Sequence, residues 1–233
     1  MHNPICLALD TPDVDRAVAL ARMLKNHVGY LKIGMEFFYA HGAKAYEAVA
    51  AEGLPIFLDL KLHDIPNTVA QGLKSLMQLA PPPAIINVHA TGGMDMMKAA
   101  RDAVGKDTKL IAVTILTSLS NQEIWKIGFE AFSTDRHVAE LSRQANAAGL
   151  DGIVCSPLDL KRLRKSLPKP FLAIVPGIRP EGANAQDQKR IATPKAAMEA
   201  GADILVIGRA ITAAADPQDA CTAILQSLAH DPS

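Results

Sequence analysis

The chain contains 233 residues, 49% of them hydrophobic, and its 24 basic side chains balance 24 acidic ones. This length suits one large α/β domain or two small ones, and the apolar content is ample for a buried core. Because the formal net charge is zero, no overall field favours nucleic acid or an anionic membrane as a partner, so any anionic ligand must be bound locally.

Cysteine usage and the amino-terminal sequence both indicate a reducing compartment. Cys6, Cys155 and Cys221 are odd in number and far apart, without the spacing of a zinc site. We expect them to be buried, reduced thiols. No basic segment followed by a long apolar run opens the sequence, and no apolar stretch approaches the length of a membrane span. These features predict a cytoplasmic protein without a membrane partner.

Short runs rich in Ile, Val and Leu recur along the whole sequence and alternate with Ala-rich segments that have helical spacing. Helical spacing is clearest over residues 14–24, 43–51 and 135–148. Strands that alternate with helices pair in parallel, and eight such units in this length favour a closed barrel over an open doubly wound sheet. We therefore predict an α/β fold, a (β/α)8 TIM barrel, as a single domain over residues 1–233. The predicted strands cover residues 5–10, 30–34, 56–61, 85–90, 110–116, 152–156, 171–177 and 204–208.

Capping residues mark several helix boundaries. Thr11-Pro12 and Thr193-Pro194 each pair a capping hydroxyl with a proline suited to the first helical position. The longest irregular stretch, residues 176–193, follows the seventh predicted strand. Loops of this length in a compact domain are typical of lids and binding loops.

Residues 57–64, with the sequence FLDLKLHD, place charged side chains in a strongly apolar predicted strand. Side chains alternate along a strand, so Asp59 and Lys61 share one face while Leu58 and Leu60 share the other. Charges on an inner face are costly unless they are paired, which favours a functional site over the alternative of a structural ion pair. A lysine flanked by carboxylates is stabilised in its charged form, so Lys61 is suited to donate a proton.

Polar residues end or follow the other predicted strands, and in a barrel of this kind the active site lies at the carboxyl ends of the strands. For Asp10, capping of the next helix is an alternative role. Gly208 and Arg209 follow the eighth strand, where such barrels bind phosphate; the alternative is that Arg209 is a surface residue. The polar residues at this rim are Asp10, Lys32, Asp59, Lys61, His89, Thr117, Arg179 and Arg209.

Six motifs together resemble one known family. They are LALD at 7–10, LKIG at 31–34, DLKLHDIPNT at 59–68, PGIRP at 176–180, DQKR at 187–190 and VIGR at 206–209. In this order and combination they resemble the orotidine 5′-phosphate decarboxylase family, and the resemblance spans nearly the whole sequence. It implies decarboxylation of orotidine 5′-monophosphate to uridine 5′-monophosphate and CO2, the last step of de novo pyrimidine synthesis, without a cofactor or metal.

The resemblance also implies roles for the residues at matching positions. Lys32, Asp59, Lys61 and Asp64 correspond to a catalytic charged network, and Asp64 and Thr68 reach across the interface of a homodimer. Asp10 corresponds to a ligand of the ribose hydroxyls and Thr117 to a contact near the pyrimidine, although the run 117–120 also allows a neighbouring position. The implied substrate-binding residues are Asp10, Lys32, Asp59, Thr68, Thr117, Arg179, Gln188, Gly208 and Arg209.

Two other functions fit parts of the pattern. A metal-dependent sugar-phosphate decarboxylase or epimerase shares the Asp59, Lys61 and Asp64 spacing and would use its carboxylates to bind Mg²⁺. A non-catalytic nucleotide-binding barrel would have no need of the charged array. The motifs at 7–10, 176–180 and 187–190 favour the cofactor-free decarboxylase over the metal-dependent enzyme, and the charged residues Lys32, Asp59, Lys61 and Asp64 favour it over the binding barrel.

Overall fold

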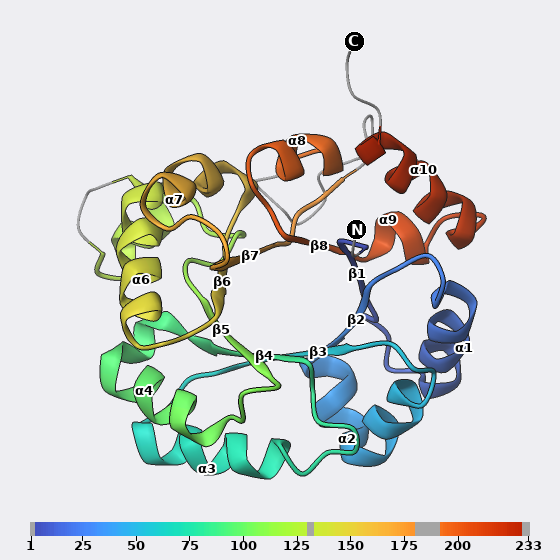
Figure 1. The fold of residues 1–233 in the computed structure, drawn as a ribbon, viewed down its shortest axis with the longest axis horizontal. Coiled ribbons are helices and arrows are strands. Elements are labelled where there is room, and N and C mark those ends of the chain that lie inside the picture. Colours follow the sequence, from blue (N-terminus) through green and yellow to red (C-terminus); the bar gives the residue numbers. More distant parts are fainter. Residues whose placement is uncertain (1–2, 130–132, 180–191, 230–233) are drawn as a thin grey trace.

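The computed structural model describes residues 3–129, 133–179 and 192–229. Within these ranges eight parallel strands close into a barrel in chain order, each pairing with the next and β8 pairing with β1. Figure 1 looks down this ring, with the helices arranged around it. The TIM barrel is therefore confirmed. The strands are β1 (Ile5–Ala8), β2 (Tyr30–Gly34), β3 (Ile56–Leu62), β4 (Ile85–His89), β5 (Lys109–Val113), β6 (Gly152–Val154), β7 (Leu172–Val175) and β8 (Ile204–Ile207).

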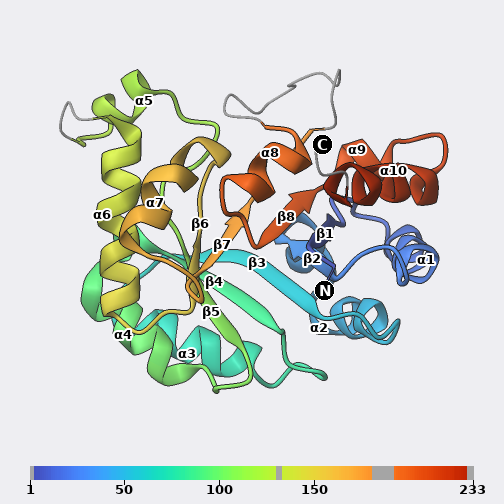
Figure 2. The ribbon, with the colours of Figure 1, turned by 45° about the horizontal axis from the view of Figure 1, so that its top comes forward.

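The helices follow the strands and cover the outside of the barrel, as the tilted view in Figure 2 also shows. Within the described ranges, none of them is both long and apolar enough to cross a membrane. The α-helices are α1 (Val14–Leu24), α2 (Met35–Ala50), α3 (Pro66–Leu76), α4 (Gly93–Ala103), α5 (Asn121–Lys126), α6 (Thr134–Ala147), α7 (Leu160–Ser166), α8 (Pro194–Glu199), α9 (Arg209–Thr212) and α10 (Pro217–Ala229); the short 3-10 helices are η1 (Ala90–Gly92) and η2 (Pro157–Asp159).

One helix cap and one helix start differ from the sequence-based expectation. Helix α1 covers the predicted residues 14–24, but its cap is Asp13 and not Thr11, because the Asp13 carboxylate accepts a hydrogen bond from the Arg16 N–H at 3.0 Å. Helix α2 begins eight residues before the predicted segment and contains a kink at Gly42, whose φ of +66° few other residues adopt. The predicted cap of α8 is confirmed, since the Thr193 hydroxyl accepts from the backbone N–H of Ala196.

Strand alternation divides the core into two layers. One layer fills the barrel interior and includes Cys6, Phe57, Ile85, Ile111, Ile174 and Ile204. The larger layer lies between the strands and the surrounding helices, and both Leu58 and Leu60 belong to it. Asp59 therefore points inward on the same face as Phe57, as the alternation predicts.

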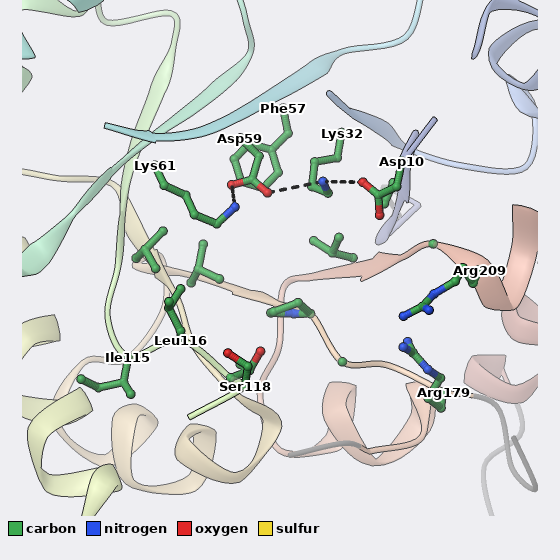
Figure 3. A pocket seen from close by; sticks show the side chains of 18 residues that line it. Asp10, Lys32, Phe57, Asp59, Lys61, Ile115, Leu116, Ser118, Arg179 and Arg209 are labelled. Atoms are coloured by element: carbon green, nitrogen blue, oxygen red, sulfur yellow. Dashed lines mark hydrogen bonds and ion pairs between the residues drawn. The ribbon is translucent and has the colours of Figure 1, made fainter. Parts of the chain in front are cut away.

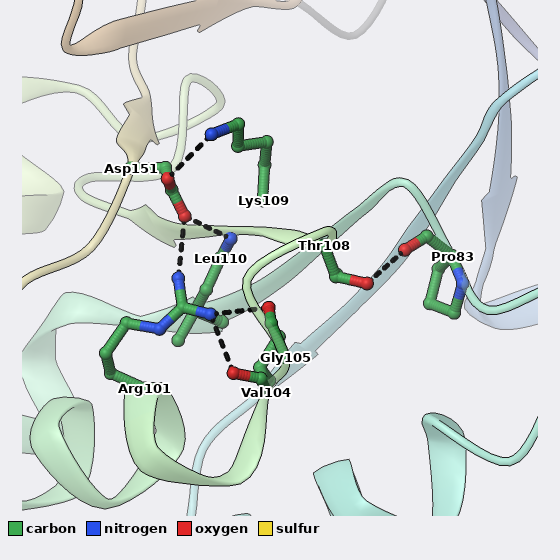
Figure 4. Close-up of polar contacts among 8 residues, drawn as sticks. All are labelled: Pro83, Arg101, Val104, Gly105, Thr108, Lys109, Leu110 and Asp151. Carbon is green, nitrogen blue, oxygen red and sulfur yellow. Dashed lines mark hydrogen bonds and ion pairs between the residues drawn. The ribbon is translucent and has the colours of Figure 1, made fainter.

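Polar contacts fix the amino-terminal end of the barrel, opposite the rim that carries the charged residues (Figure 4). Asp151, directly before β6, accepts from the Arg101 guanidinium at 2.7 Å, the Leu110 N–H at 2.9 Å and the Lys109 ammonium at 3.1 Å. The buried Thr108 hydroxyl donates to the Pro83 carbonyl at 2.7 Å. These bonds join the starts of β4, β5 and β6, and they leave the carboxyl ends available for a site.

Candidate active site

A cavity of about 290 Å³ opens at the carboxyl ends of the strands. The view in Figure 3 places a row of charged side chains from β1, β2 and β3 on one side and two arginines from the β7 and β8 ends on another. The wall includes the apolar residues Phe57, Val113 and Ile115. The cavity thus combines an apolar lining with a few convergent polar groups, as small-molecule sites do.

The charged row consists of side chains of alternating sign. The Lys32 ammonium lies 3.2 Å from an Asp10 carboxylate oxygen and 3.4 Å from Asp59 Oδ2. The other Asp59 oxygen, Oδ1, accepts from the Lys61 ammonium at 2.8 Å. Within one chain the fourth member of this network is Asp10, which contributes to the ionic row instead of capping α1.

Mutual pairing keeps the buried members of this row ionised. Burial by itself would raise the pKa of Asp59, but the ammonium groups of Lys32 and Lys61, with hydrogen bonds from Lys61 and Asn87, hold that pKa below its usual range. Burial likewise opposes the charged form of Lys32, yet Asp59 and Asp10 keep the pKa of Lys32 above its usual value. Near neutral pH the site therefore presents a fixed pattern of charges.

Asn87, in the middle of β4, is a site residue that the sequence analysis missed. Its side chain is fully buried and donates to Asp59 Oδ1 at 2.7 Å, while its carbonyl oxygen accepts from the backbone N–H of Lys61 at 2.8 Å. Lys61 has a φ of +53°, a left-handed conformation that costs on the order of 1–3 kcal/mol for a residue with a side chain. A lone amide on the inward face of an apolar strand was the available signal.

Two arginines occupy the far end of the cavity. In Figure 3 the guanidinium groups of Arg179 and Arg209 point toward one another from the ends of β7 and β8. Arg179 is 9% exposed, and its Nη1 donates to the Ile178 carbonyl at 2.9 Å. Two like charges that converge on one space are suited to an anion, which offsets their repulsion. Gly208, also part of the wall, precedes the first turn of α9.

The hydroxyl-rich segment after β5 contributes Thr117 and its neighbour Ser118 to the wall. The sequence analysis selected Thr117 and left a neighbouring position open; both side chains line the cavity. Ser120 has a different role, since it caps α5 by accepting from the Glu123 N–H. Ser156 similarly caps η2, since its hydroxyl accepts from the backbone N–H of Leu158.

Two predicted site residues among those that the structure describes, Asp64 and Thr68, lie outside this cavity. Asp64 and Thr68 are exposed, and Asp64 Oδ1 accepts from the N–H of Ile65 at 2.7 Å. Gln188 lies outside the described residues. His89, at the end of β4, does not line the cavity either. Its ring lies 5.4 Å from that of His63, and burial together with His63 and Lys61 lowers the pKa of His89 to about 4, so it is neutral at neutral pH.

The described side chains of this cavity are poorly suited to bind a divalent cation. In the described part of the chain, no three side chains of His, Cys, Asp or Glu gather in a way that could hold a metal ion. The space between Asp10 and Asp59 contains the Lys32 ammonium, whose positive charge repels a second cation.

A family model for the orotidine 5′-phosphate decarboxylase / HUMPS family matches residues 3–224. The chain belongs to this family. Two curated proteins named orotidine 5′-phosphate decarboxylase, from Sphingopyxis alaskensis and Novosphingobium aromaticivorans, are each 50% identical to it over 228 residues. Each match covers 98% of this chain and all of the relative. The crystal structure of orotidine 5′-phosphate decarboxylase from Lactobacillus acidophilus superposes with a TM-score of 0.84 at 36% identity, covering 98% of this chain and all of that one.

The depressed pKa of Asp59 predicts how stability depends on pH. Above the unfolded-state pKa of about 4 the ionised carboxylate stabilises the fold, and this contribution is lost as pH falls through the lower folded-state pKa. We expect Asp59→Asn to lower the unfolding free energy by about 1–3 kcal/mol at neutral pH, a value discounted for the open cavity. Urea denaturation should show the difference from wild type shrinking below a pH of about 4.

A matched control is Glu140→Gln, which removes a carboxylate that pairs with Arg143 on the exposed surface of α6. Solvent screens this pair, so we expect little change at any pH. A wild-type advantage over Asp59→Asn that stayed constant throughout acidification would contradict the assignment of Asp59 as an ionised, lysine-paired group.

Proposed function

We propose that the protein decarboxylates orotidine 5′-monophosphate to uridine 5′-monophosphate and CO2, the last step of de novo pyrimidine nucleotide synthesis, without a cofactor. The observation that carries this proposal is the Lys61 ammonium, held 2.8 Å from the buried Asp59 carboxylate in a cavity whose other end contains two arginines. Relatives that bear the name of this enzyme and match along nearly the whole chain support it.

The chemistry requires a localised carbanion to be stabilised. When the bond from C6 to the carboxylate breaks, the electron pair stays in an sp² orbital at C6, out of conjugation with the ring carbonyls. The Lys61 ammonium stabilises this charge and then transfers a proton to C6, leaving a neutral amine that water reprotonates. Lys61 therefore acts as both the electrostatic partner and the general acid.

Asp59 and Lys32 determine the electrostatic environment of Lys61. Asp59 lies next to the departing carboxylate in this arrangement, and its negative charge disfavours the bound substrate more than the transition state, in which CO2 is becoming neutral. Lys32 contacts both Asp10 and Asp59, so it fixes the spacing of the row. A preorganised array of charges needs no reorganisation when the bond breaks.

The remaining groups of the cavity suit the rest of a nucleotide. Arg179, Arg209 and the backbone at Gly208 bind the phosphate, and Gln188 adds a contact from the 176–193 loop, which we propose to act as a lid. Asp10, with its side chain 60% exposed, accepts from the ribose hydroxyls. Thr117 and Ser118 contact the pyrimidine. Phosphate binding far from C6 can then contribute to the transition state through closure of the loop.

We further propose a homodimer in which Asp64 and Thr68 complete the partner's site. Residues 63–68 form a continuous exposed segment between β3 and the first turn of α3. Ile65, in the middle of this segment, is 66% exposed, which is costly for an isoleucine in water and typical of a contact surface. Asp64 lies three residues after Lys61 in the sequence, so in the proposed dimer an interface at this segment brings Asp64 close to the partner's charged row.

The metal-dependent sugar-phosphate reaction of the same structural class is the alternative. It needs carboxylates free to bind Mg²⁺, whereas Lys32 neutralises Asp10 and Asp59. A purely nucleotide-binding barrel would have no use for a buried ionic row that costs desolvation energy. Both alternatives predict outcomes different from ours in a single assay.

The assay follows the loss of orotate absorbance after purified protein is mixed with orotidine 5′-monophosphate, with and without EDTA. We expect turnover that EDTA leaves unchanged, and we expect Lys61→Ala to lose at least about 10²- to 10³-fold in kcat, the scale of a lost transition-state donor. Lys109→Ala is the matched control, since this lysine also pairs with an aspartate but at the opposite end of the barrel.

Absence of turnover in the wild-type protein would reject the proposed reaction. Turnover of Lys61→Ala within tenfold of wild type would reject Lys61 as the proton donor. Loss of activity in EDTA would favour the metal-dependent alternative.

The phosphate assignment predicts a defect that depends on the substrate. Arg209→Ala should lose about 1.5–3 kcal/mol of binding from charge-assisted hydrogen bonds, or about 10- to 100-fold in kcat/KM. The comparison substrate is orotidine, which lacks the phosphate, and for it the variant and wild type should react at equal rates. An equal loss with both substrates would show that Arg209 does not act through the phosphate.

The shared site predicts complementation between inactive variants. Lys61→Ala and Asp64→Ala homodimers each lack one part of every site, but a mixed dimer contains one site with both residues intact. After unfolding and refolding of an equal mixture, we expect about a quarter of wild-type activity from random pairing in a two-fold dimer. Activity no greater than the sum of the separate variants would place Asp64 in its own chain's site or outside the reaction.

A further inference from the structure

Asn87 is a fully buried amide in β4, and the other buried residues of this strand, Ile85, Ile86 and Val88, are apolar. It points toward the barrel interior, on the same face as Ile85, which belongs to the interior layer. A buried amide that lacks hydrogen bonds is costly, so a side chain of this kind is tied to specific partners. Both ends of the Asn87 side chain make such bonds, and both partners belong to the β3 segment that carries Asp59 and Lys61.

The pairing of β3 with β4 is irregular at this point. Leu58 pairs with Ile86, but Leu62 pairs with Val88, so residues 59–61 lie opposite Asn87 alone. Extra residues of this kind form a β-bulge, which breaks the backbone ladder and redirects side chains. The Lys61 N–H, displaced from regular pairing, donates instead to Asn87 Oδ1 at 2.8 Å. The amide of Asn87 thus substitutes for a peptide group in the ladder.

We propose that Asn87 is a positioning residue for the reaction, which fixes the left-handed backbone at Lys61 and the orientation of Asp59 so that the Lys61 ammonium faces the reacting carbon. This inference rests on the proposed function, because it assigns Asn87 to the same reaction. It goes beyond that function by making the catalytic geometry of β3 depend on a side chain of β4 that does not line the cavity.

The chemistry of the site explains why an asparagine is needed. The amide donates to Asp59 through its nitrogen and accepts from Lys61 through its oxygen, so it serves an anion and a backbone donor at once. An ionised aspartate would satisfy Lys61 but would repel Asp59 across a contact now 2.7 Å long. An alanine would leave the Lys61 N–H unsatisfied and the strained φ of +53° unsupported.

The first test is Asn87→Ala, assayed with orotidine 5′-monophosphate. We expect kcat to fall by about 10- to 100-fold, as for other residues that orient a catalytic group from behind. KM should change by less than about threefold, because the arginines that bind the phosphate lie on β7 and β8 ends, away from β4. A merely structural role would lower the amount of folded protein and leave kcat per folded molecule unchanged.

The second test is Asn87→Asp, which has nearly the same shape. Two titratable groups face this position, Asp59 and Lys61 of β3. Lys32 lies behind Asp59, and His89 of β4 lies nearby with His63. When protonated, the new carboxyl donates to Asp59 as the amide did; when ionised, it repels Asp59. The ratio of variant to wild-type kcat should therefore rise as pH is lowered, a trend that Asn87→Ala should lack.

Thr108→Val is the matched control for stability. It removes another buried hydrogen bond of the β4 and β5 strands, but at the amino-terminal end of the barrel (Figure 4). We expect it to lower the melting temperature while leaving kcat unchanged. Equal kcat losses in Thr108→Val and Asn87→Ala, or kcat in Asn87→Ala within threefold of wild type, would overturn the inference.

The activity of wild-type protein, measured beside the variants, distinguishes failure of the proposed function from failure of the role of Asn87. An inactive wild type contradicts the proposed function, whereas an active wild type with an unaffected Asn87→Ala contradicts only the role of Asn87. A crystal structure of Asn87→Ala or Asn87→Asp provides a readout independent of activity. We expect the Lys61 φ to become negative and its ammonium to leave Asp59 in Asn87→Ala; an unchanged Lys61 would overturn the inference.

Discussion

The Asp59 carboxylate, enclosed between the ammonium groups of Lys32 and Lys61, is the interaction on which the rest of the site depends. Each of its two oxygens contacts a different lysine. Oδ2 lies 3.4 Å from the Lys32 ammonium, and Oδ1 accepts from the Lys61 ammonium at 2.8 Å. Removal of Asp59 would leave two neighbouring ammonium groups without the carboxylate that they share. Lys32 and Asp59 therefore stay ionised, and Asp59 holds the Lys61 ammonium at the carboxyl end of β3.

The reactive charges and the arginines of the cavity come from different parts of the barrel. Asp59 and Lys61 come from β3, whereas Arg179 and Arg209 follow β7 and β8 (Figure 3). A ligand with an anion at one end and a reacting group at the other can contact both sets only if it spans the cavity. This arrangement supports the proposed substrate, which has its phosphate at one end and its reacting pyrimidine at the other.

Stability and function are assigned to opposite ends of the same strands. The barrel is held closed by the interior and helix-facing apolar layers and by the Asp151 contacts at the amino-terminal end, none of which includes a charged residue of the cavity. The carboxyl ends contain the features that oppose stability, namely the left-handed Lys61 and the desolvated charges. Strain at this rim is tolerated because the surrounding strands fix its geometry.

The sequence by itself determined the barrel and most of the cavity lining. Strands and their alternation are local patterns, and in a parallel barrel the carboxyl ends of all strands lie on one rim. Asp10, Lys32, Asp59, Lys61, Thr117, Arg179, Gly208 and Arg209 were all identified this way, and all line one cavity. Only the tertiary structure determined which of these side chains contact one another. The pairing of Lys32 with Asp10, the bulge opposite Asn87 and the contribution of Ser118 depend on register between strands, which no single segment encodes. The charges of β3 could be identified from the sequence, but Asn87, the amide that orients them, lies 26 residues beyond Lys61, on the next strand.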